Sequence, residues 1–270
     1  MSGTSAITFP QLTAAAFDRI AALIRSACGI VLADGKQSLV QSRLQMRARE
    51  LGCATFDDYV DFVESDPSGH ERARLIDKLT TNKTLFFREE AHFEYLRDII
   101  VPECRAIGSE ISVWCAGCST GEEPLTFGMC LADTGLDLRL LATDISPSVL
   151  EHARRGIYEA RAVENVPQRL LSRFFVRLPD GRFGVDQALR DRITYAALNL
   201  MNPWPMRGPF DVISCRNVMI YFDRETQDAL VRRFRELLRP GGHLLVGHSE
   251  SFKAETLGLR QVRAATYVRN

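Results

Sequence analysis

The chain has 270 residues, of which 46% are hydrophobic and 25% are charged, and this composition is that of an ordinary soluble globular protein. Its 34 Lys and Arg residues balance 34 Asp and Glu residues, which argues against a general nucleic-acid-binding protein because such proteins carry a basic excess. No apolar run approaches the roughly 20 residues of a membrane span, and the first residues lack the basic and then apolar pattern of a signal peptide. The seven Cys are odd in number and lie mostly in apolar segments, so a reducing cytoplasm is the expected location.

Residues 1–80 are predicted to form a small all-helical domain, after a polar and loose start of about ten residues. Apolar side chains recur at helical spacing in four stretches, over residues 11–28, 36–51, 56–63 and 71–79. Gly29 and Gly52 are expected to end the first two helices, and Thr55 is expected to cap the third.

Three basic residues of the second predicted helix, Lys36, Arg43 and Arg47, fall on one side of it by the 3.6-residue period. A basic stripe of this kind is either a solvated face or a docking face for an acidic helical partner. Both interpretations stay open from the residues alone.

Residues 81–104 are interpreted as a linker followed by the first helix of a second domain, over 89–104. The stretch from Thr80 to Glu89 is polar, then doubly aromatic, then charged, and a plain linker would be less aromatic. Because seams between domains are favoured ligand sites, this stretch is a candidate part of a binding site.

The second domain, residues 105–270, begins with the pattern of a ligand-binding turn. An apolar run from Ile111 predicts a buried strand, small residues follow from Ala116 to Gly121, and a helix is expected to begin at Glu122. Such a turn places backbone N–H groups and the positive end of a helix dipole beside a ligand. A second strand ends at Asp144, where a carboxylate can bind a ribose diol.

The glycine spacing narrows the class of nucleotide. Gly117 and Gly121 are four residues apart, with Ser119 where a dinucleotide fingerprint has its second Gly, and no Walker lysine follows. NAD and ATP are therefore disfavoured, and S-adenosylmethionine, a nucleoside without a pyrophosphate, is favoured. Cys115 and Cys118 form a C-x-x-C that is interpreted as small residues of the turn, because no second pair has metal-ligand spacing.

The remainder of the second domain alternates strands and helices, which predicts a mostly parallel, doubly wound sheet. Helices are expected over 147–156, capped by Ser146, and after Asp223 as far as a stop at 239–242. Further strands are expected over 193–200, 210–215, 243–247 and 261–269. Residues 159–192 break this rhythm, and their turn at 179–181 predicts a hairpin in a small β excursion that replaces a crossover helix.

Polar residues follow the predicted strands at the edge where doubly wound sheets bind ligands. They are Glu122, Glu123, Asp144, Asn199, Arg216, Asn217, His248, Ser249 and Glu250.

Several of these stretches together resemble the chemotaxis receptor methyltransferases of the CheR family. The matching stretches, in order along nearly the whole chain, are Thr81-Asn82-Lys83-Thr84, Phe86-Phe87-Arg88-Glu89, Ser119-Thr120-Gly121-Glu122-Glu123-Pro124, Ala142-Thr143-Asp144-Ile145, Cys215-Arg216-Asn217-Val218-Met219-Ile220-Tyr221-Phe222 and Gly247-His248-Ser249-Glu250. The resemblance implies an N-terminal helical receptor-docking domain, a class I (Rossmann-like) methyltransferase domain and a β-subdomain inserted in it. It also implies methyl transfer from S-adenosylmethionine to glutamate side chains on the cytoplasmic coiled coil of chemoreceptors, with S-adenosylhomocysteine as product.

The resemblance also implies roles for individual residues. Asn82, Thr84 and Arg88 would line the methionine and active-site end, Glu123 or its neighbour Glu122 would hold the sulfonium amino acid, and Asp144 would hold the ribose. Asn199 and Leu200 would flank the adenine, Arg216 and Asn217 would touch cofactor and substrate, and Tyr221 would lie at the target site beside Arg88. No metal ligand is expected, and the basic side of the second helix would meet the acidic receptor.

The loop over residues 178–182 looks shorter than in family members that tether a peptide from the receptor C-terminus, so no such tether is expected. Two alternative functions remain open. One is methylation of a small molecule or nucleic acid, and the other is a cofactor-binding sensor that signals through its helical domain. The first is disfavoured because Arg216-Asn217-Val218-Met219 lacks the Pro of nitrogen-methylating enzymes.

Overall fold

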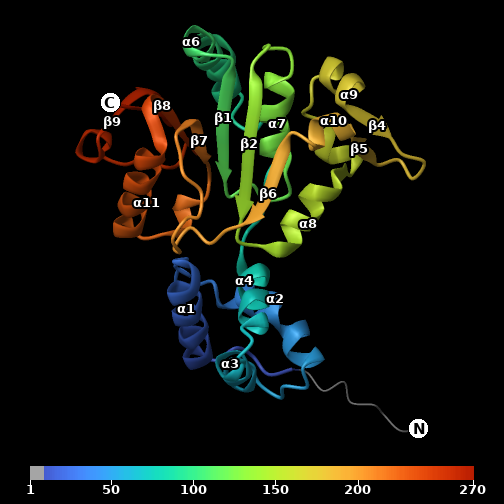
Figure 1. Ribbon diagram of the computed structural model, residues 1–270. Coiled ribbons are helices and arrows are strands. Elements are labelled where there is room, and N and C mark those ends of the chain that lie inside the picture. Colours follow the sequence, from blue (N-terminus) through green and yellow to red (C-terminus); the bar gives the residue numbers. More distant parts are fainter. Residues whose placement is uncertain (1–8) are drawn as a thin grey trace. The chain divides into compact units, whose positions relative to one another are not determined.

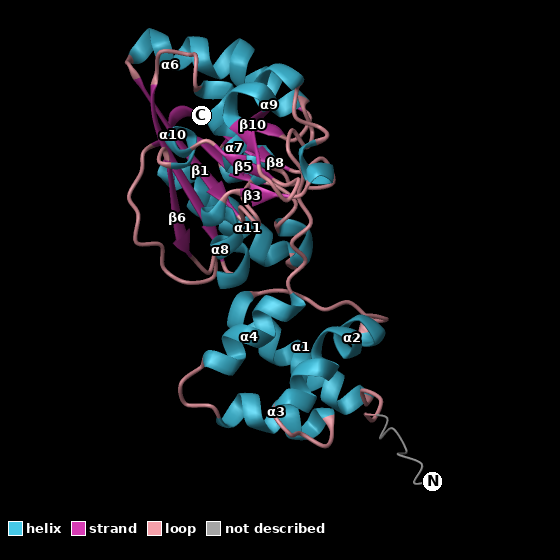
Figure 2. Ribbon diagram, turned by 90° about the vertical axis from the view of Figure 1, so that its right-hand side faces the viewer, coloured by secondary structure: helices cyan, strands magenta, loops and turns pink. Residues whose placement is uncertain are grey.

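A computed structural model describes residues 9–270, so the expectation for the first residues lies mostly outside the described part (Figure 1). The chain divides into two compact units, one ending at Thr81 and one running from Asn82 to Asn270. The strands belong to the second unit, while the described part of the first is built from helices and loops (Figure 2). No helix of residues 9–270 is both long and apolar enough to cross a bilayer.

The first unit contains the helices α1 (Ala14–Cys28), α2 (Gln37–Glu50), α3 (Phe56–Ser65) and α4 (His70–Leu79). The predicted caps are confirmed: Gly29 ends α1 at a φ of 76°, and Thr55 forms a capping box with Asp58 at the start of α3. Phe9 is buried against Phe56, with ring centroids 5.0 Å apart, so the loose start that was expected does not extend to this residue.

The second unit is built on a sheet of seven strands, in the order β6-β2-β1-β7-β8-β10-β9. Its strands are β1 (Glu110–Ala116), β2 (Asp137–Asp144), β6 (Ile193–Ala197), β7 (Phe210–Cys215), β8 (Leu238–Val246), β9 (Leu259–Arg263) and β10 (Thr266–Arg269). The pairs from β6 to β8 are parallel, and only β10 runs antiparallel to both of its neighbours. The predicted doubly wound, mostly parallel fold is confirmed.

Helices cover this sheet as the alternating pattern requires (Figure 1). α7 (Glu122–Leu131) and α8 (Pro147–Arg155) pack on β2, and α11 (Arg224–Leu237) packs on β8. Ser146 caps α8 and Asp223 caps α11, as predicted.

The expected single helix over 89–104 is wrong in detail: α5 (Ala91–Tyr95) passes through a π-helical turn, η1 (Leu96–Ile100), into α6 (Val101–Ile107). Pro102 lies at the start of α6, where its missing N–H removes a regular helical bond.

The interrupted region forms a three-stranded antiparallel sheet of β3 (Ile157–Tyr158), β5 (Phe183–Val185) and β4 (Phe175–Arg177). The predicted hairpin is confirmed. The same region also contains short helices that were not predicted, η2 (Ala160–Val163), α9 (Gln168–Phe174) and α10 (Gln187–Arg190).

Three predicted strand boundaries also need correction. β6 ends at Ala197 rather than at 200, since the side chain of Asn199 accepts the N–H of Met201 and turns the chain. β8 begins at Leu238 and includes the glycines that were expected to lie before it. The single last strand is two strands, joined at Ala264-Ala265, where the φ of Ala265 is 55°.

Candidate functional site

The order of the main sheet reverses between β1 and β7, which creates a crevice at the carboxyl ends of these strands in folds of this type. The loops that follow the two strands touch, because a Cβ at Gly117 would overlap the side chain of Val218. Gly117 also has a φ of 92°, so both the backbone angle and the close approach require glycine. These two loops carry most of the predicted site residues.

Asp144 is the buried anchor of the glycine turn at the end of β1. One carboxylate oxygen accepts the backbone N–H of Ser119 at 2.8 Å, and the other accepts the N–H of Ser146 at 3.0 Å. The Ser119 hydroxyl in turn donates to the carbonyl of Asn82 at 2.8 Å. The structure therefore brings together the glycine turn, the predicted ribose acceptor and the segment that opens the second unit.

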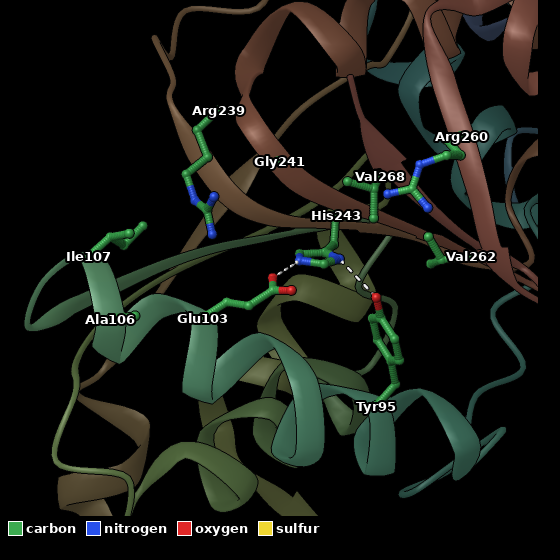
Figure 3. A pocket seen from close by; sticks show the side chains of 10 residues that line it. All are labelled: Tyr95, Glu103, Ala106, Ile107, Arg239, Gly241, His243, Arg260, Val262 and Val268. Carbon is green, nitrogen blue, oxygen red and sulfur yellow. Dashed lines mark hydrogen bonds and ion pairs between the residues drawn. The ribbon is translucent and has the colours of Figure 1, made fainter.

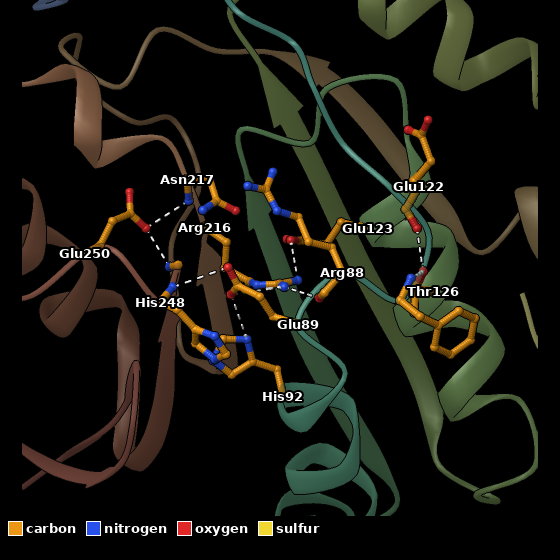
Figure 4. A network of polar contacts seen from close by, with 12 residues as sticks. Arg88, Glu89, His92, Glu122, Glu123, Thr126, Arg216, Asn217, His248 and Glu250 are labelled. Carbon is orange, nitrogen blue, oxygen red and sulfur yellow. Dashed lines mark hydrogen bonds and ion pairs between the residues drawn. The ribbon is translucent and has the colours of Figure 1, made fainter. Parts of the chain in front are cut away.

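Arg216 is the centre of a buried polar cluster, with its side chain only 2% exposed (Figure 4). Its guanidinium donates to Glu123 at 2.9 Å, to Glu89 at 3.3 Å and to the carbonyl of Arg88. The guanidinium also lies 5.5 Å from the ring centre of Phe93. Two carboxylates and a carbonyl thus hold one cation in a fixed position at the end of β7.

The sequence interpretation missed Glu89 as a site residue, although its carboxylate pairs with Arg216 at 3.3 Å, somewhat farther than the 2.9 Å of Glu123. Burial acts to raise the pKa of Glu89, but Arg216 and the N–H of His248 outweigh it and hold the pKa below its usual value. The available signal was the pair of charged residues, Arg88 and Glu89, that follows two aromatic residues, although no local pattern indicates a partner more than a hundred positions away.

The two adjacent glutamates at the start of α7 point to different places (Figure 4). Glu123 faces Arg216, whereas the carboxylate of Glu122 accepts the hydroxyl of Thr120 at 2.6 Å. Burial raises the pKa of Glu122, against the hydrogen bond from Thr120. Of the pair left open by the sequence, Glu123 is therefore the one that joins the cluster.

Glu250 fixes the loops that follow β7 and β8. Its carboxylate accepts the backbone N–H groups of Asn217 at 2.8 Å, Ile220 at 3.2 Å and Gly247 at 2.5 Å. Asn217 has a φ of 59°, a conformation uncommon for residues other than glycine, and its buried Oδ1 atom lacks a hydrogen-bond partner among the described residues. A buried acceptor of this kind, beside the switch point, is available to a ligand donor.

The predicted catalytic side chains are less enclosed than the Arg216 cluster. The guanidinium of Arg88 donates to the carbonyl of Lys83 at 3.0 Å, and no carboxylate in residues 9–270 pairs with it. Tyr221 ends the 3₁₀ turn η3 (Met219–Tyr221) and is half-buried, and its hydroxyl makes no hydrogen bond within the described chain. Thr84, which lies between Asn82 and Arg88 in the sequence, is half-buried.

Asn199 and Leu200 follow β6, next to the end of β2. The backbone N–H of Leu198 donates to the carbonyl of Asp144 at 2.9 Å, which holds this turn beside the predicted ribose site. The carbonyl of Leu200 accepts the indole N–H of Trp204 at 3.2 Å and the guanidinium of Arg233 at 2.6 Å. The turn is therefore fixed from both sides.

The basic stripe predicted on α2 is largely engaged inside the first unit. Arg47 donates to the buried carboxylate of Glu71 at 2.6 Å and 3.0 Å, and Arg43 donates to the carbonyls of Leu79 and Thr80 at 2.9 Å each. Arg47 is therefore held by an ion pair and Arg43 by a helix C-terminus, while the docking role of Lys36, Arg43 and Arg47 stays a prediction. Lys36 is exposed.

A cavity of about 520 Å³ lies away from the predicted residues (Figure 3). It is lined by residues of α5, α6, β8, β9 and β10. Among them is His243, which lies 2.8 Å from Glu103 and 3.4 Å from the hydroxyl of Tyr95. His243 precedes the carboxyl end of β8, where the crevice loops begin, so this cavity is not the ligand edge of the sheet.

Cys115 and Cys118 are buried as free thiols, and burial raises the pKa of each well above its usual value. A thiol held neutral is a poor nucleophile and a poor metal ligand. The interpretation of this C-x-x-C as small residues of the turn agrees with these surroundings.

Comparison with known proteins identifies the family. The CheR methyltransferase all-alpha domain matches residues 15–80, and the CheR methyltransferase SAM-binding domain matches residues 82–268. A chemotaxis protein methyltransferase of Borreliella burgdorferi is 37% identical, covering 96% of this chain and 96% of its own, and one of Escherichia coli is 44% identical, covering 89% and 86%. A probable chemotaxis protein methyltransferase of Rhizobium etli is 43% identical, covering 86% and 91%.

The site fits the methyl donor of that family. The unpaired Oδ1 atom of Asn217 can accept from an ammonium group, and the buried carboxylate of Asp144 lies at the end of β2, where folds of this type bind a ribose. With the doubly wound sheet, the polar side chains gathered at its switch point and family matches over nearly its whole length, this chain belongs to the CheR family of S-adenosylmethionine-dependent methyltransferases of chemotaxis.

Proposed function

We propose that this chain transfers the methyl group of S-adenosylmethionine to the side-chain carboxylates of specific glutamates in chemoreceptors. The acceptors would lie in the cytoplasmic coiled coil, and the products would be glutamyl methyl esters and S-adenosylhomocysteine. Relatives named chemotaxis protein methyltransferases support a role in chemotaxis, and the carboxylate target is inferred from the chemistry of the site.

A glutamate acceptor requires no general base, because its reference pKa of about 4.3 leaves it ionised at pH 7. The S–CH₃ bond of the sulfonium breaks as a carboxylate oxygen bonds to the methyl carbon, and both charges disappear. Consistent with this, the buried imidazole of His92 is a poor base: burial, with the positive charge of Arg216, lowers its pKa to about 4. Orientation and exclusion of water would be the main contributions, worth roughly 7–11 kcal/mol at best.

The observation that carries the proposal is two hydrogen-bond donors, one before α5 and one after β7, that lack an acidic partner among residues 9–270. Arg88 keeps donors free for a carboxylate, because its guanidinium meets only the carbonyl of Lys83. Tyr221 presents a hydroxyl that is free of protein hydrogen bonds in the described chain. We assign Arg88 to steering the acceptor carboxylate and Tyr221 to orienting it.

The remaining site residues are assigned to the methyl donor. Asp144 would accept the ribose hydroxyls, and Asn199 with Leu200 would flank the adenine. Glu123, Arg216 and Asn217 would hold the charged methionine end, assisted by Asn82 and Thr84. Support comes from the hydrogen bonds that join these segments at one edge of the sheet.

Receptor docking is assigned to the helical domain, residues 1–80, and catalysis to residues 105–270, with 81–104 between them. Lys36, which is exposed, and Arg43, which contacts only uncharged oxygens, would provide most of the long-range attraction to an acidic coiled coil, since the charge of Arg47 is paired with Glu71. Residues 159–192 would act without a peptide tether. The turn over residues 178–182 is compact, and its ends are joined by the Leu178 N–H to Arg182 carbonyl bond of 2.8 Å.

The test is incubation with methyl-labelled S-adenosylmethionine and receptor cytoplasmic fragments. Base-labile label on receptor glutamates is expected, and label on a small molecule, or none, would reject the proposal. Arg88→Ala should reduce transfer far more than affinity for S-adenosylhomocysteine measured by calorimetry. Arg97→Ala, which removes an exposed arginine elsewhere, is the matched control. Equal losses of transfer and affinity for Arg88→Ala would reassign that residue to binding of the methyl donor.

A further inference from the structure

His92, in α5, is a buried histidine whose ring nitrogens make no hydrogen bond of regular geometry among the described residues, although the backbone of Ala265 is close enough to act on its pKa. It is 1% exposed. Buried polar side chains nearly always have a protein or water partner, so two unpaired ring nitrogens on one buried side chain require an explanation. The proposed methyl transfer does not use this side chain.

Two further ligand-type side chains surround the ring of His92 (Figure 4). The Nδ1 atom of His92 lies 3.6 Å from a carboxylate oxygen of Glu89, and its ring centre lies 5.3 Å from that of His248. One ligand atom from each of the three residues lies within 4.8 Å of the other two. The residues come from the start of α5 and from the loop after β8, which tertiary contacts alone bring together.

These separations suit a small divalent cation. Metal–ligand distances of about 2.0–2.2 Å place neighbouring ligand atoms of a tetrahedral Zn²⁺ site roughly 3.3–3.6 Å apart. The Nδ1 atom of His92 and the carboxylate oxygen of Glu89 already have this spacing. The ring of His248 would have to move closer to these two atoms. His248 is exposed on a loop, so it is free to move, and it leaves the metal an entry path and an open fourth position for water.

The local charge also permits a cation. Arg216 is close by, but it lies between the carboxylates of Glu89 and Glu123, so the group has two acids for one base. The carboxylate of Glu89 is held at the site by the backbone N–H of His248, which donates to it at 3.3 Å.

We propose that Glu89, His92 and His248 form a binding site for a divalent transition-metal ion with a preference for nitrogen ligands, of which Zn²⁺ is the type. Two imidazoles and one carboxylate are the ligand set of many open three-ligand sites. This site is distinct from the donors assigned to the methyl acceptor.

The test is calorimetric titration of the full chain with Zn²⁺ after treatment with a chelator, together with the visible absorption spectrum of Co²⁺ as a substitute. One Zn²⁺ per chain is expected, with a Co²⁺ spectrum of nitrogen and oxygen ligation and no thiolate band. His248→Ala should weaken binding at least about 10-fold, since even loss of a supporting group costs that much. Because His248 is exposed, this variant removes one proposed ligand without disturbing the core. His92→Phe removes the buried proposed ligand in the same test.

His152→Ala and Cys53→Ser are the matched controls, an exposed histidine and a half-buried thiol elsewhere in the chain. Both should bind Zn²⁺ as the unmodified chain does. Excess Zn²⁺ should also raise the melting temperature of the unmodified chain but not that of His248→Ala. Absence of binding, binding unchanged by His248→Ala, or binding lost in either control would each overturn the proposal.

Discussion

Replacing Arg47 by Met tests whether this residue stabilises the helical unit or serves mainly to dock a partner. Arg47 makes a two-pronged contact with Glu71, through Nη2 at 2.6 Å and Nε at 3.0 Å, and Tyr59 donates to the same carboxylate at 3.1 Å. The side chain of Glu71 is 5% exposed and that of Arg47 is 18% exposed. Methionine keeps the apolar stem but leaves the buried carboxylate without its cation.

The expected loss follows from this burial. Removing one partner of a buried ion pair costs about 3–5 kcal/mol, and we take the lower end, about 3 kcal/mol, because Arg47 is partly exposed. A change of that size lowers the protection of the slowest-exchanging amides of α2 and α4 by roughly two orders of magnitude.

Native-state hydrogen exchange on the full chain measures this loss directly. Both Trp residues, Trp114 and Trp204, lie in the second unit, so tryptophan fluorescence reports separately that this unit is intact. Arg72→Met, which removes an exposed arginine from α4, is the matched control and should change protection by less than about threefold, the range of surface substitutions. A loss for Arg47→Met as small as that of the control would refute the structural role and return Arg47 to the docking surface.

Four further outcomes are expected. Asp144→Ala should weaken binding of S-adenosylhomocysteine by about an order of magnitude or more in calorimetry, because a buried diol loses its acceptor; unchanged affinity would remove this residue from the site. Glu123→Gln should weaken that binding more than Glu122→Gln does, since only the former faces the arginine cluster, and the reverse order would show that the assignment is wrong. Glu250→Ala should lower the free energy of unfolding by about 3 kcal/mol or more in denaturant titrations, because three backbone N–H groups lose their acceptor, and a loss below 1 kcal/mol would contradict the anchoring role. Lys36→Glu should slow receptor methylation without changing affinity for S-adenosylhomocysteine, and an unchanged rate would place docking elsewhere.

The helix caps and turns could be predicted from the sequence, because their geometry depends on residues only a few positions apart. Thr55, Ser146 and Asp223 cap the helices as expected, because a capping side chain bonds a backbone group only two or three residues away. The glycine turn after β1 and the start of α7 at Glu122 were predictable for the same reason. The π-helical turn before Pro102 was missed, because a single proline does not specify how the preceding turn adjusts.

Contacts between distant segments were not predictable in this way. The positions of Lys36, Arg43 and Arg47 on one helix side follow from the helical period, but the capture of Arg47 by Glu71 depends on how α2 packs on α4. Likewise, Glu89 and Arg216 pair only because the fold brings the start of α5 to the end of β7. The predicted strand ends indicated which segments would lie close together. The ion-pair partner of each charged residue could be identified only from the tertiary structure.

A crystal structure with S-adenosylhomocysteine tests the central claim most directly. The nucleoside is expected beside the turn of Gly117 and Gly121, with its ribose hydroxyls on the carboxylate of Asp144 and its amino-acid end toward Arg216. Binding of the same molecule in the cavity around His243, with the crevice between β1 and β7 vacant, would contradict the assignment of the site.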